Sequence, residues 1–273
     1  MTAVLFTWSN TFIFINQLDQ QVPKISSELR KNFVKATCEE IIGFKTDGMI
    51  FLERISSGQN KNIDFNWDFY NADGSTAEMC GNAARCAALY FHAKINKKNN
   101  ITFNTVAGAI AAEVLDSEIG IVKVRMPKII NIKDKQEIYA NGKKMIGFYV
   151  NTGVPHFVIQ QEPNLSLARA LRKASEFGKA GANITFVDFN VDEQDKCFIQ
   201  AVTYERGVED FTLACGTGAV AAAKFHINTF PDLLQQTVEM PGGLLKVEWE
   251  NETPYLTGTA EFQFDLNLYE EPK

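Results

Sequence analysis

The sequence predicts an α+β fold of two pseudo-symmetric domains, in each of which a mostly antiparallel sheet wraps around a central helix. The prediction rests first on two Cys-Gly pairs, Cys80-Gly81 and Cys215-Gly216, each of which precedes an Ala-rich run. The cysteines are 215 − 80 = 135 positions apart, and Gly108 and Gly243 share this offset because 108 + 135 = 243. In both halves an alternating strand, a turn, Cys-Gly, a helix, a strand, a glycine turn and a further strand follow in that order, which indicates an internal repeat.

The first half is divided into elements by its hydrophobic periodicity and its turn residues. Residues 63–70 alternate strictly between apolar and polar side chains, which is typical of a half-buried strand, and residues 71–75, Asn-Ala-Asp-Gly-Ser, form a turn after it. The Ala-rich run at 83–93 predicts the helix that follows Cys80. The remaining predicted elements are strands at 4–16, 48–53, 101–105, 110–115 and 121–126 and a helix at 25–37.

The second half, which we expect to begin near Gly120, contains the same kinds of element. Residues 165–177 have the spacing of an amphipathic helix that ends at Gly178, and a second helix follows Cys215. The predicted strands are at 145–151, 156–160, 183–189, 196–204, 238–240, 244–249 and 257–264. We therefore place one domain at 1–119 and the other at 120–260, and expect a C-terminal strand within 261–273 to return to the first.

Composition narrows the class of protein. The chain has 273 residues, 45% hydrophobic and 22% charged, and its net charge of −6 argues against nucleic-acid binding. It has no run of about 18 apolar residues and no basic segment near its start, so we expect neither a membrane span nor a signal peptide. The five cysteines are odd in number and widely spread, and no Cys/His spacing resembles a zinc site. We therefore expect a cytoplasmic protein with no metal, nucleic-acid or membrane partner.

Each Cys-Gly pair places a thiol at the N-terminus of a helix. Unpaired N–H groups and the positive end of the helix dipole would lower the pKa of such a thiol. Cys215 alone could equally be a buried core cysteine, the role we expect for Cys38, Cys86 and Cys197. The repeat favours a reactive thiol, because pseudo-two-fold symmetry would bring two helix N-termini, with Cys80 and Cys215, to face one another across a cleft.

Two opposed thiols can invert a carbon centre without a cofactor. One thiolate removes a proton from one face of the carbon, and the other thiol delivers a proton to the opposite face. The carbanion between these steps must be stabilised. Backbone amides at the two helix N-termini, those of Gly81, Asn82, Gly216 and Thr217, would bind the substrate carboxylate and provide this stabilisation.

A set of short motifs runs along nearly the whole chain. In order they are Asn71-Ala72-Asp73-Gly74-Ser75, Cys80-Gly81-Asn82, Arg85-Cys86, Gly153-x-Pro155-His156, Asn183, Tyr204-Glu205-Arg206-Gly207, Leu213-Ala214-Cys215-Gly216-Thr217-Gly218 and Pro241-Gly242-Gly243. Each motif alone is weak evidence, but the combination is specific, and with it the chain resembles the diaminopimelate epimerase family. The resemblance implies cofactor-free interconversion of LL- and meso-2,6-diaminopimelate in lysine and peptidoglycan-precursor biosynthesis, by a homodimer.

The resemblance also implies roles for individual residues. Cys80 and Cys215 are the two acid/base thiols, His156 lies near them and tunes them, and Glu205 holds the reacting ammonium group of the substrate. Arg206 suits a carboxylate because its guanidinium can pair bidentately. The implied substrate-binding residues are Asn10, Asn71, Gly81, Asn82, Asn183, Glu205, Arg206, Gly216 and Thr217.

Several of these residues also have a purely local interpretation. His156 could be a hydrogen-bonded turn residue, Asn71 could serve the Asn-Ala-Asp-Gly turn, and Glu205-Arg206 could be a surface ion pair.

The chain departs from the family pattern near the expected recognition end. The glycines expected before Asn10 are absent, Val154 replaces an asparagine and Phe211 replaces a glutamate. The reaction type is therefore better supported than the substrate. A two-cysteine racemase of another amino acid on the same fold is the alternative, and a non-catalytic binding protein on this scaffold is a third possibility.

Overall fold

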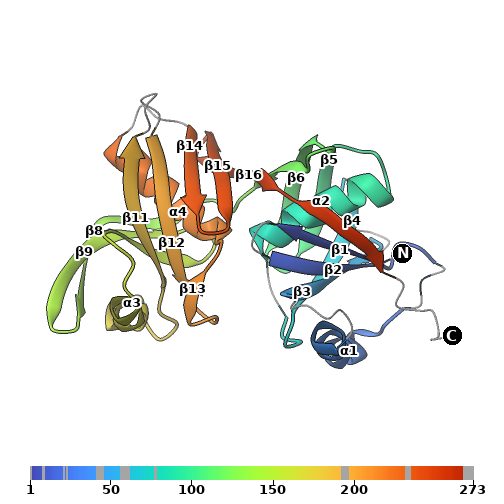
Figure 1. The fold of residues 1–273 in the computed structure, drawn as a ribbon, viewed down its shortest axis with the longest axis horizontal. Coiled ribbons are helices and arrows are strands. Elements are labelled where there is room, and N and C mark those ends of the chain that lie inside the picture. The colour runs from blue at the N-terminus through green and yellow to red at the C-terminus, as the bar shows by residue number, and fades with distance from the viewer. Residues whose placement is uncertain are drawn as a thin grey trace. The chain divides into compact units, whose positions relative to one another are not determined.

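The computed structural model describes residues 2–7, 10–20, 22, 24–40, 46–55, 62–76, 79–191, 197–230 and 235–266. The chain folds into two compact units (Figure 1). Unit 1 comprises Met1–Val124 and Gly258–Lys273, and unit 2 comprises Arg125–Thr257. The sequence predicts domain boundaries after residues 119 and 260, whereas the two compact units divide after residues 124 and 257. The domain boundaries themselves stay a prediction.

Unit 1 is built on one mixed sheet with two helices. Its strand order is β17-β1-β2-β3-β4-β5-β6-β7, in which the pairs β2–β3 and β4–β5 are parallel and the others antiparallel. The strands are β1 (Thr2–Thr7), β2 (Asn10–Asn16), β3 (Gly48–Glu53), β4 (Phe65–Asn71), β5 (Asn100–Thr105), β6 (Gly108–Asp116), β7 (Ile121–Arg125) and β17 (Glu261–Leu266). The helices are α1 (Ser27–Glu40) and α2 (Gly81–Lys94).

Unit 2 repeats this pattern. Its strand order is β8-β9-β10-β11-β12-β14-β15-β16, with β10–β11 and β12–β14 parallel, and β13 pairs with β12. The strands are β8 (Ile130–Ala140), β9 (Lys143–Asn151), β10 (Pro155–Gln160), β11 (Asn183–Val191), β12 (Cys197–Glu205), β13 (Asp210–Thr212), β14 (Gln235–Met240), β15 (Gly243–Glu250) and β16 (Thr253–Thr259). The helices are α3 (Leu165–Arg172), a 3-10 turn η1 (Ser175–Phe177) and α4 (Gly216–Thr229).

The repeat predicted from the sequence is present in the fold, with one offset for the buried helices and for the hairpins that follow them. Helix α2 spans 81–94 and α4 spans 216–229, and 81 + 135 = 216 while 94 + 135 = 229. The hairpins β5–β6 and β14–β15 also share one register, because Thr105 pairs with Gly108 and Met240 pairs with Gly243. The α+β prediction with two similar, mostly antiparallel sheets is therefore confirmed.

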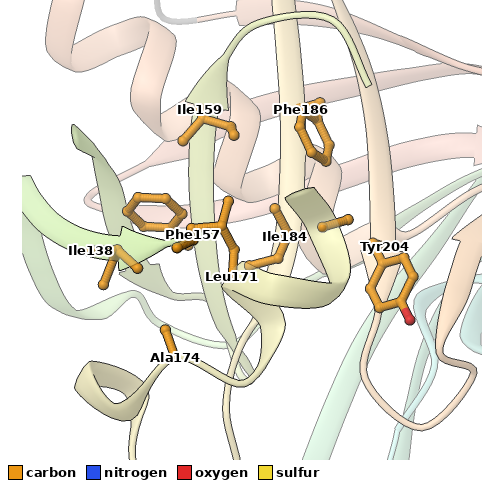
Figure 2. Packing of buried hydrophobic residues seen from close by; sticks show 10 residues of the cluster. Ile138, Phe157, Ile159, Leu171, Ala174, Ile184, Phe186 and Tyr204 are labelled. Atoms are coloured by element: carbon orange, nitrogen blue, oxygen red, sulfur yellow. The ribbon is translucent and has the colours of Figure 1, made fainter. Parts of the chain in front are cut away.

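Strand alternation gives the sheet of unit 2 two different faces. Phe157, Ile184 and Tyr204 on β10, β11 and β12 point to one face, where Leu171 of α3 covers them (Figure 2). Successive side chains of a strand point to opposite faces, so the residues next to these in sequence point to the other face, where α4 packs.

Unit 1 has the same two faces. Buried residues of β2 and β3, such as Ile13 and Phe51, pack with Val34 of α1. On the opposite face the Phe14 ring stacks on Tyr90 of α2 at 5.3 Å between ring centroids. Each sheet thus lies between an outer helix and one Ala-rich helix that is buried along most of its length.

Several predicted boundaries shift by two or three residues, and three predicted elements are divided or end early. The strand expected at 4–16 is two antiparallel strands, β1 and β2, and residues 8 and 9 between them lie outside the described residues. The helix expected at 165–177 ends at Arg172, because Ala174 adopts an extended backbone, and a separate 3-10 turn follows. The strand expected at 257–264 is divided at Ala260, whose N–H bonds to the carbonyl of Gly120 at 2.8 Å.

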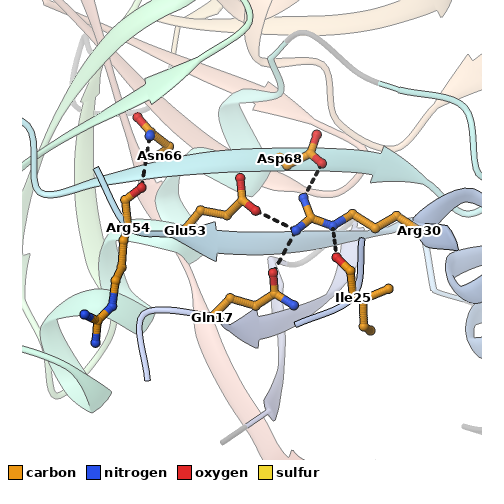
Figure 3. A network of polar contacts seen from close by, with 7 residues as sticks. All are labelled: Gln17, Ile25, Arg30, Glu53, Arg54, Asn66 and Asp68. Carbon is orange, nitrogen blue, oxygen red and sulfur yellow. Dashed lines mark hydrogen bonds and ion pairs between the residues drawn. The ribbon is translucent and has the colours of Figure 1, made fainter. Parts of the chain in front are cut away.

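Arg30 of α1 ties the outer helix of unit 1 to the sheet (Figure 3). Its guanidinium is buried and forms ion pairs with Glu53 and Asp68, both at 2.5 Å. It also donates to Gln17 Oε1 at 2.7 Å and to the Ile25 carbonyl at 3.1 Å. One cation therefore satisfies side chains from β3 and β4, which would otherwise repel each other.

We expect Arg30→Met to lower the free energy of unfolding by about 3 kcal/mol, because it leaves two carboxylates next to each other without a counter-charge. Chemical denaturation measures this loss. Arg54→Met is the matched control, since Arg54 bonds to the Leu18 carbonyl at an exposed position, and it should cost less than about 0.5 kcal/mol. Equal losses in the two variants would show that the Arg30 ion pairs contribute nothing.

Candidate active site

The face of the unit 2 sheet that α4 covers is polar at one end of three strands. His156 of β10 lies beside Asn183 of β11 in the parallel register. Thr185 and Thr203 continue this group, and all four side chains are buried. Burying so many polar groups is favourable only if they bond to one another. This group therefore indicates a site rather than an ordinary core.

Cys215 is placed beside this polar group by the first turn of α4. It is the N-cap residue of the helix, with an extended backbone, and its side chain is buried. Its Sγ lies 3.4 Å from Thr217 Oγ1, and it also hydrogen-bonds to the Glu205 carboxylate at the end of β12. A Cβ on Gly218 would lie 2.4 Å from Thr203 Oγ1, so only glycine lets the helix approach β12 this closely.

The pKa of Cys215 is raised, which contradicts the expectation that a helix N-terminus would lower it. Burial is the main cause, and the neighbouring Glu205 carboxylate adds to it, while the Gly218 N–H and Thr217 act in the opposite direction. Burial also raises the pKa of Glu205. The helix dipole is thus outweighed by desolvation and by a nearby negative charge, and Cys215 is a protonated thiol in this environment.

The hydrogen bonds of His156 determine which ring nitrogen carries its proton. The backbone N–H of Arg206 donates to Asn183 Oδ1 at 2.8 Å, which turns the Asn183 amide so that Nδ2 faces His156 Nε2 at 3.3 Å. Because Nδ2 can only donate, Nε2 is the unprotonated nitrogen. The proton is therefore on Nδ1, which lies 3.0 Å from Thr185 Oγ1.

The same bonds connect His156 to the thiol through one hydroxyl. Thr217 Oγ1 lies 3.0 Å from His156 Nε2, so the Thr217 hydroxyl can donate a hydrogen bond to the ring. The same oxygen lies 3.4 Å from Cys215 Sγ. Burial, with a smaller contribution from the Arg206 charge, lowers the pKa of His156 to about 3. His156 is therefore neutral, and Thr217 lies between its ring and the Cys215 thiol.

Arg206 is held by a turn that is itself fixed from two sides. Glu209 in this turn has a positive φ of 57°, and its carbonyl accepts from Tyr204 Oη at 2.7 Å. Its carboxylate accepts from Arg172 Nη2 of α3 at 2.8 Å. The residues after β12 are thus bound both to the strand and to the outer helix.

In unit 1 the Cys80 group is smaller. Cys80 is the N-cap residue of α2 and is half-buried. Asn82, one residue past Gly81, donates from Nδ2 to Asn10 Oδ1 of β2. Arg85 Nη2 donates to Asn82 Oδ1 at 2.8 Å. Cys80, Gly81, Asn82 and Asn10 are therefore brought together as expected.

Asn71 has a local role in the structure. Its Nδ2 donates to Ser75 Oγ at 2.9 Å, and its backbone N–H bonds to the Ser75 carbonyl at 2.8 Å. Cys38 and Cys86 are buried as predicted, and the side chain of Cys197 lies outside the described residues. That the Cys80 group and the Cys215 group meet around one substrate stays a prediction, because the two groups belong to different units.

Some residues of the site were not predicted from the sequence. Thr185, Thr203, Arg172 and Glu209 have no motif, and threonine at alternate strand positions looks like any half-buried strand. Across the described part of the chain, no group of three or more His, Cys, Asp or Glu side chains could hold a metal ion. In that same part, every helix is too short or too polar to span a bilayer.

Comparison with known proteins places this chain in a family. The family model described as "Diaminopimelate epimerase" matches residues 2–130 and 148–263. Among curated relatives, the diaminopimelate epimerase of Aquifex aeolicus is 34% identical, covering 96% of this chain and 95% of that protein. The enzyme of the same name from Hydrogenobaculum is 36% identical, covering 94% of each chain.

Solved structures support the fold. A phenazine biosynthesis protein of Bacillus anthracis superposes with a TM-score of 0.69 at 13% identity, covering 97% of this chain and 98% of that one. A probable proline racemase of Agrobacterium radiobacter superposes with a TM-score of 0.67 at 11% identity, covering 98% of this chain and 94% of that one. The family model and the relatives cover most of the sequence, including both Cys-Gly pairs, and the chain therefore belongs to the diaminopimelate epimerase family.

Proposed function

We propose that the chain is a cofactor-independent epimerase that interconverts LL- and meso-2,6-diaminopimelate in lysine and peptidoglycan-precursor biosynthesis. One observation carries the proposal: the internal repeat puts a cysteine at the N-cap of the buried helix in both units, in a chain of this family. The described contacts around Cys80 and Cys215 support an acid/base role for both. We further propose that the enzyme is a cytoplasmic homodimer.

The reaction needs one thiolate and one thiol at opposite faces of the same carbon. The thiolate takes the α-proton, and the electron pair of the C–H bond remains on the carbon. The thiol then transfers its proton to the opposite face, so that thiol and thiolate have exchanged roles and the configuration is inverted. The N–H groups in the first turns of α2 and α4 would stabilise the charge that moves toward the substrate carboxylate.

The groups around Cys215 would support this exchange in different ways. Glu205 accepts a hydrogen bond from the thiol and would hold the ammonium group on the reacting carbon. His156 is neutral and would fix Thr217, so that the thiol remains in one orientation. In this proposal His156 neither gives nor takes a proton.

Arg206 and Asn183 would bind the far amino-acid group of diaminopimelate, with Asn10 and Asn71 from unit 1. The Arg206 backbone is held by Asn183, which leaves its guanidinium for a carboxylate. Val154, where the family has an amide side chain, removes one donor from this end. The residues that bind the far end of the substrate, and not the two thiols, therefore decide whether diaminopimelate or another amino acid is the substrate.

Deuterium uptake tests the reaction. LL-diaminopimelate incubated with the reduced enzyme in deuterated buffer should yield meso product carrying deuterium at the inverted carbon. We expect Cys80→Ala and Cys215→Ala each to slow this at least about 100-fold, the usual contribution of a general acid or base. Cys38→Ala, in α1, is the control and should retain activity. Full activity in either of the first two variants would contradict the two-thiol mechanism.

Substrate recognition is tested at Arg206. Arg206→Met should raise KM for diaminopimelate about 10- to 100-fold and change kcat less, because it removes a charged hydrogen bond to the distal carboxylate. Arg169→Met, on the exposed side of α3, is the matched control. Steady-state kinetics measure both. Equal label exchange on amino acids without a second amino-acid group, unaffected by Arg206→Met, would favour the racemase alternative.

The neutral His156 makes stability depend on pH. The folded protein keeps this ring unprotonated down to a pKa of about 3, whereas the unfolded chain binds a proton near 6.5. The stabilisation is therefore complete above pH 6.5 and is lost as the pH falls toward 3. Between these values the free energy of unfolding should fall, per pH unit, by about 1.4 kcal/mol more in the wild type than in His156→Gln. Parallel denaturation curves for the two proteins across this range would refute a neutral buried His156.

A further inference from the structure

The repeat allows the two helices to be compared position by position, and one difference is large. Position 85 of α2 corresponds to position 85 + 135 = 220 of α4. The first is Arg85 and the second is Val220, and both are buried. A buried apolar position of one helix is therefore occupied by a cation in the other, on the helix that begins at Cys80.

The sheets behind the two helices differ in the opposite sense. Gly48 of unit 1 corresponds to Asn183 of unit 2, because 48 + 135 = 183. Gly48 pairs with Phe12 on the neighbouring parallel strand, and Asn183 pairs with His156, so Phe12 and His156 occupy equivalent positions. Next to these, Ile50 corresponds to Thr185, because 50 + 135 = 185. Unit 2 therefore presents a buried histidine and threonine to its helix, whereas unit 1 presents apolar side chains. Apart from Asn10 at the start of β2, the polar side chains described near Cys80 come from the helix itself.

Arg85 forms hydrogen bonds that connect it to two side chains predicted to bind the substrate, those of Asn82 and Asn10. Its Nη2 donates to Asn82 Oδ1 at 2.8 Å, and its Nε donates to the Thr259 carbonyl at 3.3 Å. Because Asn82 Oδ1 faces the guanidinium, the Asn82 amide directs Nδ2 to Asn10 Oδ1. Within the described residues, Nη1 of Arg85 is buried without a hydrogen-bond partner.

The charge of Arg85 also lacks a carboxylate partner within the described residues. The strands that pack on α2 offer few acids: β1, β2 and β5 contain no titratable residue, and Glu113 and Asp116 of β6 are exposed. On β17, Glu261 is exposed as well, and Asp265 pairs with Lys94 at the other end of the helix. On α2 itself the groups besides Lys94 are the N-cap Cys80, Cys86, Tyr90 and His92, of which burial keeps Tyr90 a neutral phenol and His92 is near the C-terminal end.

A buried guanidinium is expensive without an anion, so the two thiols that interact with it electrostatically are the relevant groups. Burial raises the pKa of Cys86 to about 12, so Cys86 remains a thiol. Cys80, at the half-buried N-terminus of the helix, is the thiol that can ionise beside Arg85.

We propose that Arg85 is a positioning residue that orients Asn82 toward Asn10 and supplies the counter-charge of the Cys80 thiolate, so that the free enzyme holds a thiolate at Cys80 and a thiol at Cys215. The catalytic role of Arg85 in this proposal rests on the proposed two-thiol function. Cys80 then takes the first proton and Cys215 gives one, after which the charge on the thiols is reversed. Arg85 favours the return to the starting state when the product leaves.

The test is the pH dependence of thiol alkylation, which needs no turnover. The reduced enzyme is treated with iodoacetamide between about pH 5 and pH 10, and Cys80 and Cys215 are quantified by peptide mass spectrometry. We expect the midpoint for Cys80 to rise by about one pH unit in Arg85→Gln, which keeps donors but loses the charge, and to return toward wild type in Arg85→Lys. The midpoint for Cys215 should not move in either variant.

Arg30→Gln is the matched control, because it removes the other buried arginine of unit 1, which is paired with carboxylates and lies on the α1 side. It should leave the Cys80 midpoint unchanged. An unchanged Cys80 midpoint in folded Arg85→Gln, or an equal rise in Arg30→Gln, would overturn the proposal. A shift in Arg85→Gln in a protein that exchanges no label into diaminopimelate would instead uphold the role of Arg85 and refute the proposed substrate.

Discussion

Every polar group buried at the first turn of α4 has to be matched by another, and this constraint organises unit 2. Asn183 accepts a hydrogen bond from the backbone N–H of Arg206 and donates one to His156. His156 in turn accepts from Thr217, the hydroxyl that touches Cys215. Asn183 Nδ2 and the Thr217 hydroxyl therefore converge on one ring nitrogen, Nε2 of His156. The protonation state of the thiol is thus connected to the turn that presents Arg206.

The repeat preserves backbone positions more closely than side chains. The two buried helices start and end at equivalent residues, and the hairpins after them share one register. On this common frame, His156 stands in one unit where Phe12 stands in the other, and Arg85 stands where Val220 stands. Strand and helix geometry tolerate these exchanges because each replacement remains buried on the same face. The chemistry of each thiol is therefore set by a few side chains and not by the fold.

The positions of the thiols could be predicted from the sequence, because a Cys-Gly pair before an Ala-rich run is a local signal for a helix start. Strand β8 was not predicted, since most of its residues are exposed and it has no apolar alternation. The raised pKa of Cys215 was not predicted either, because it depends on burial and on Glu205, ten residues earlier in the chain. Arg85 belongs to one of the motifs, but its role cannot be predicted from the sequence. Its lack of a carboxylate partner within the described residues is visible only once the neighbouring strands are placed.

An enzyme that uses two thiols on one carbon must avoid having both in the same protonation state. Two thiolates could each accept a proton but neither could give one, and two thiols could not begin the reaction. Identical surroundings would give the two cysteines equal affinity for the single proton that they share. In the proposed mechanism the Glu205 carboxylate near Cys215 and the Arg85 guanidinium, which interacts with Cys80, would remove this degeneracy in the same sense, since the first favours the thiol and the second the thiolate. The side-chain differences between the two halves would therefore allow a pseudo-symmetric fold to carry out the proposed reaction, which requires two different groups.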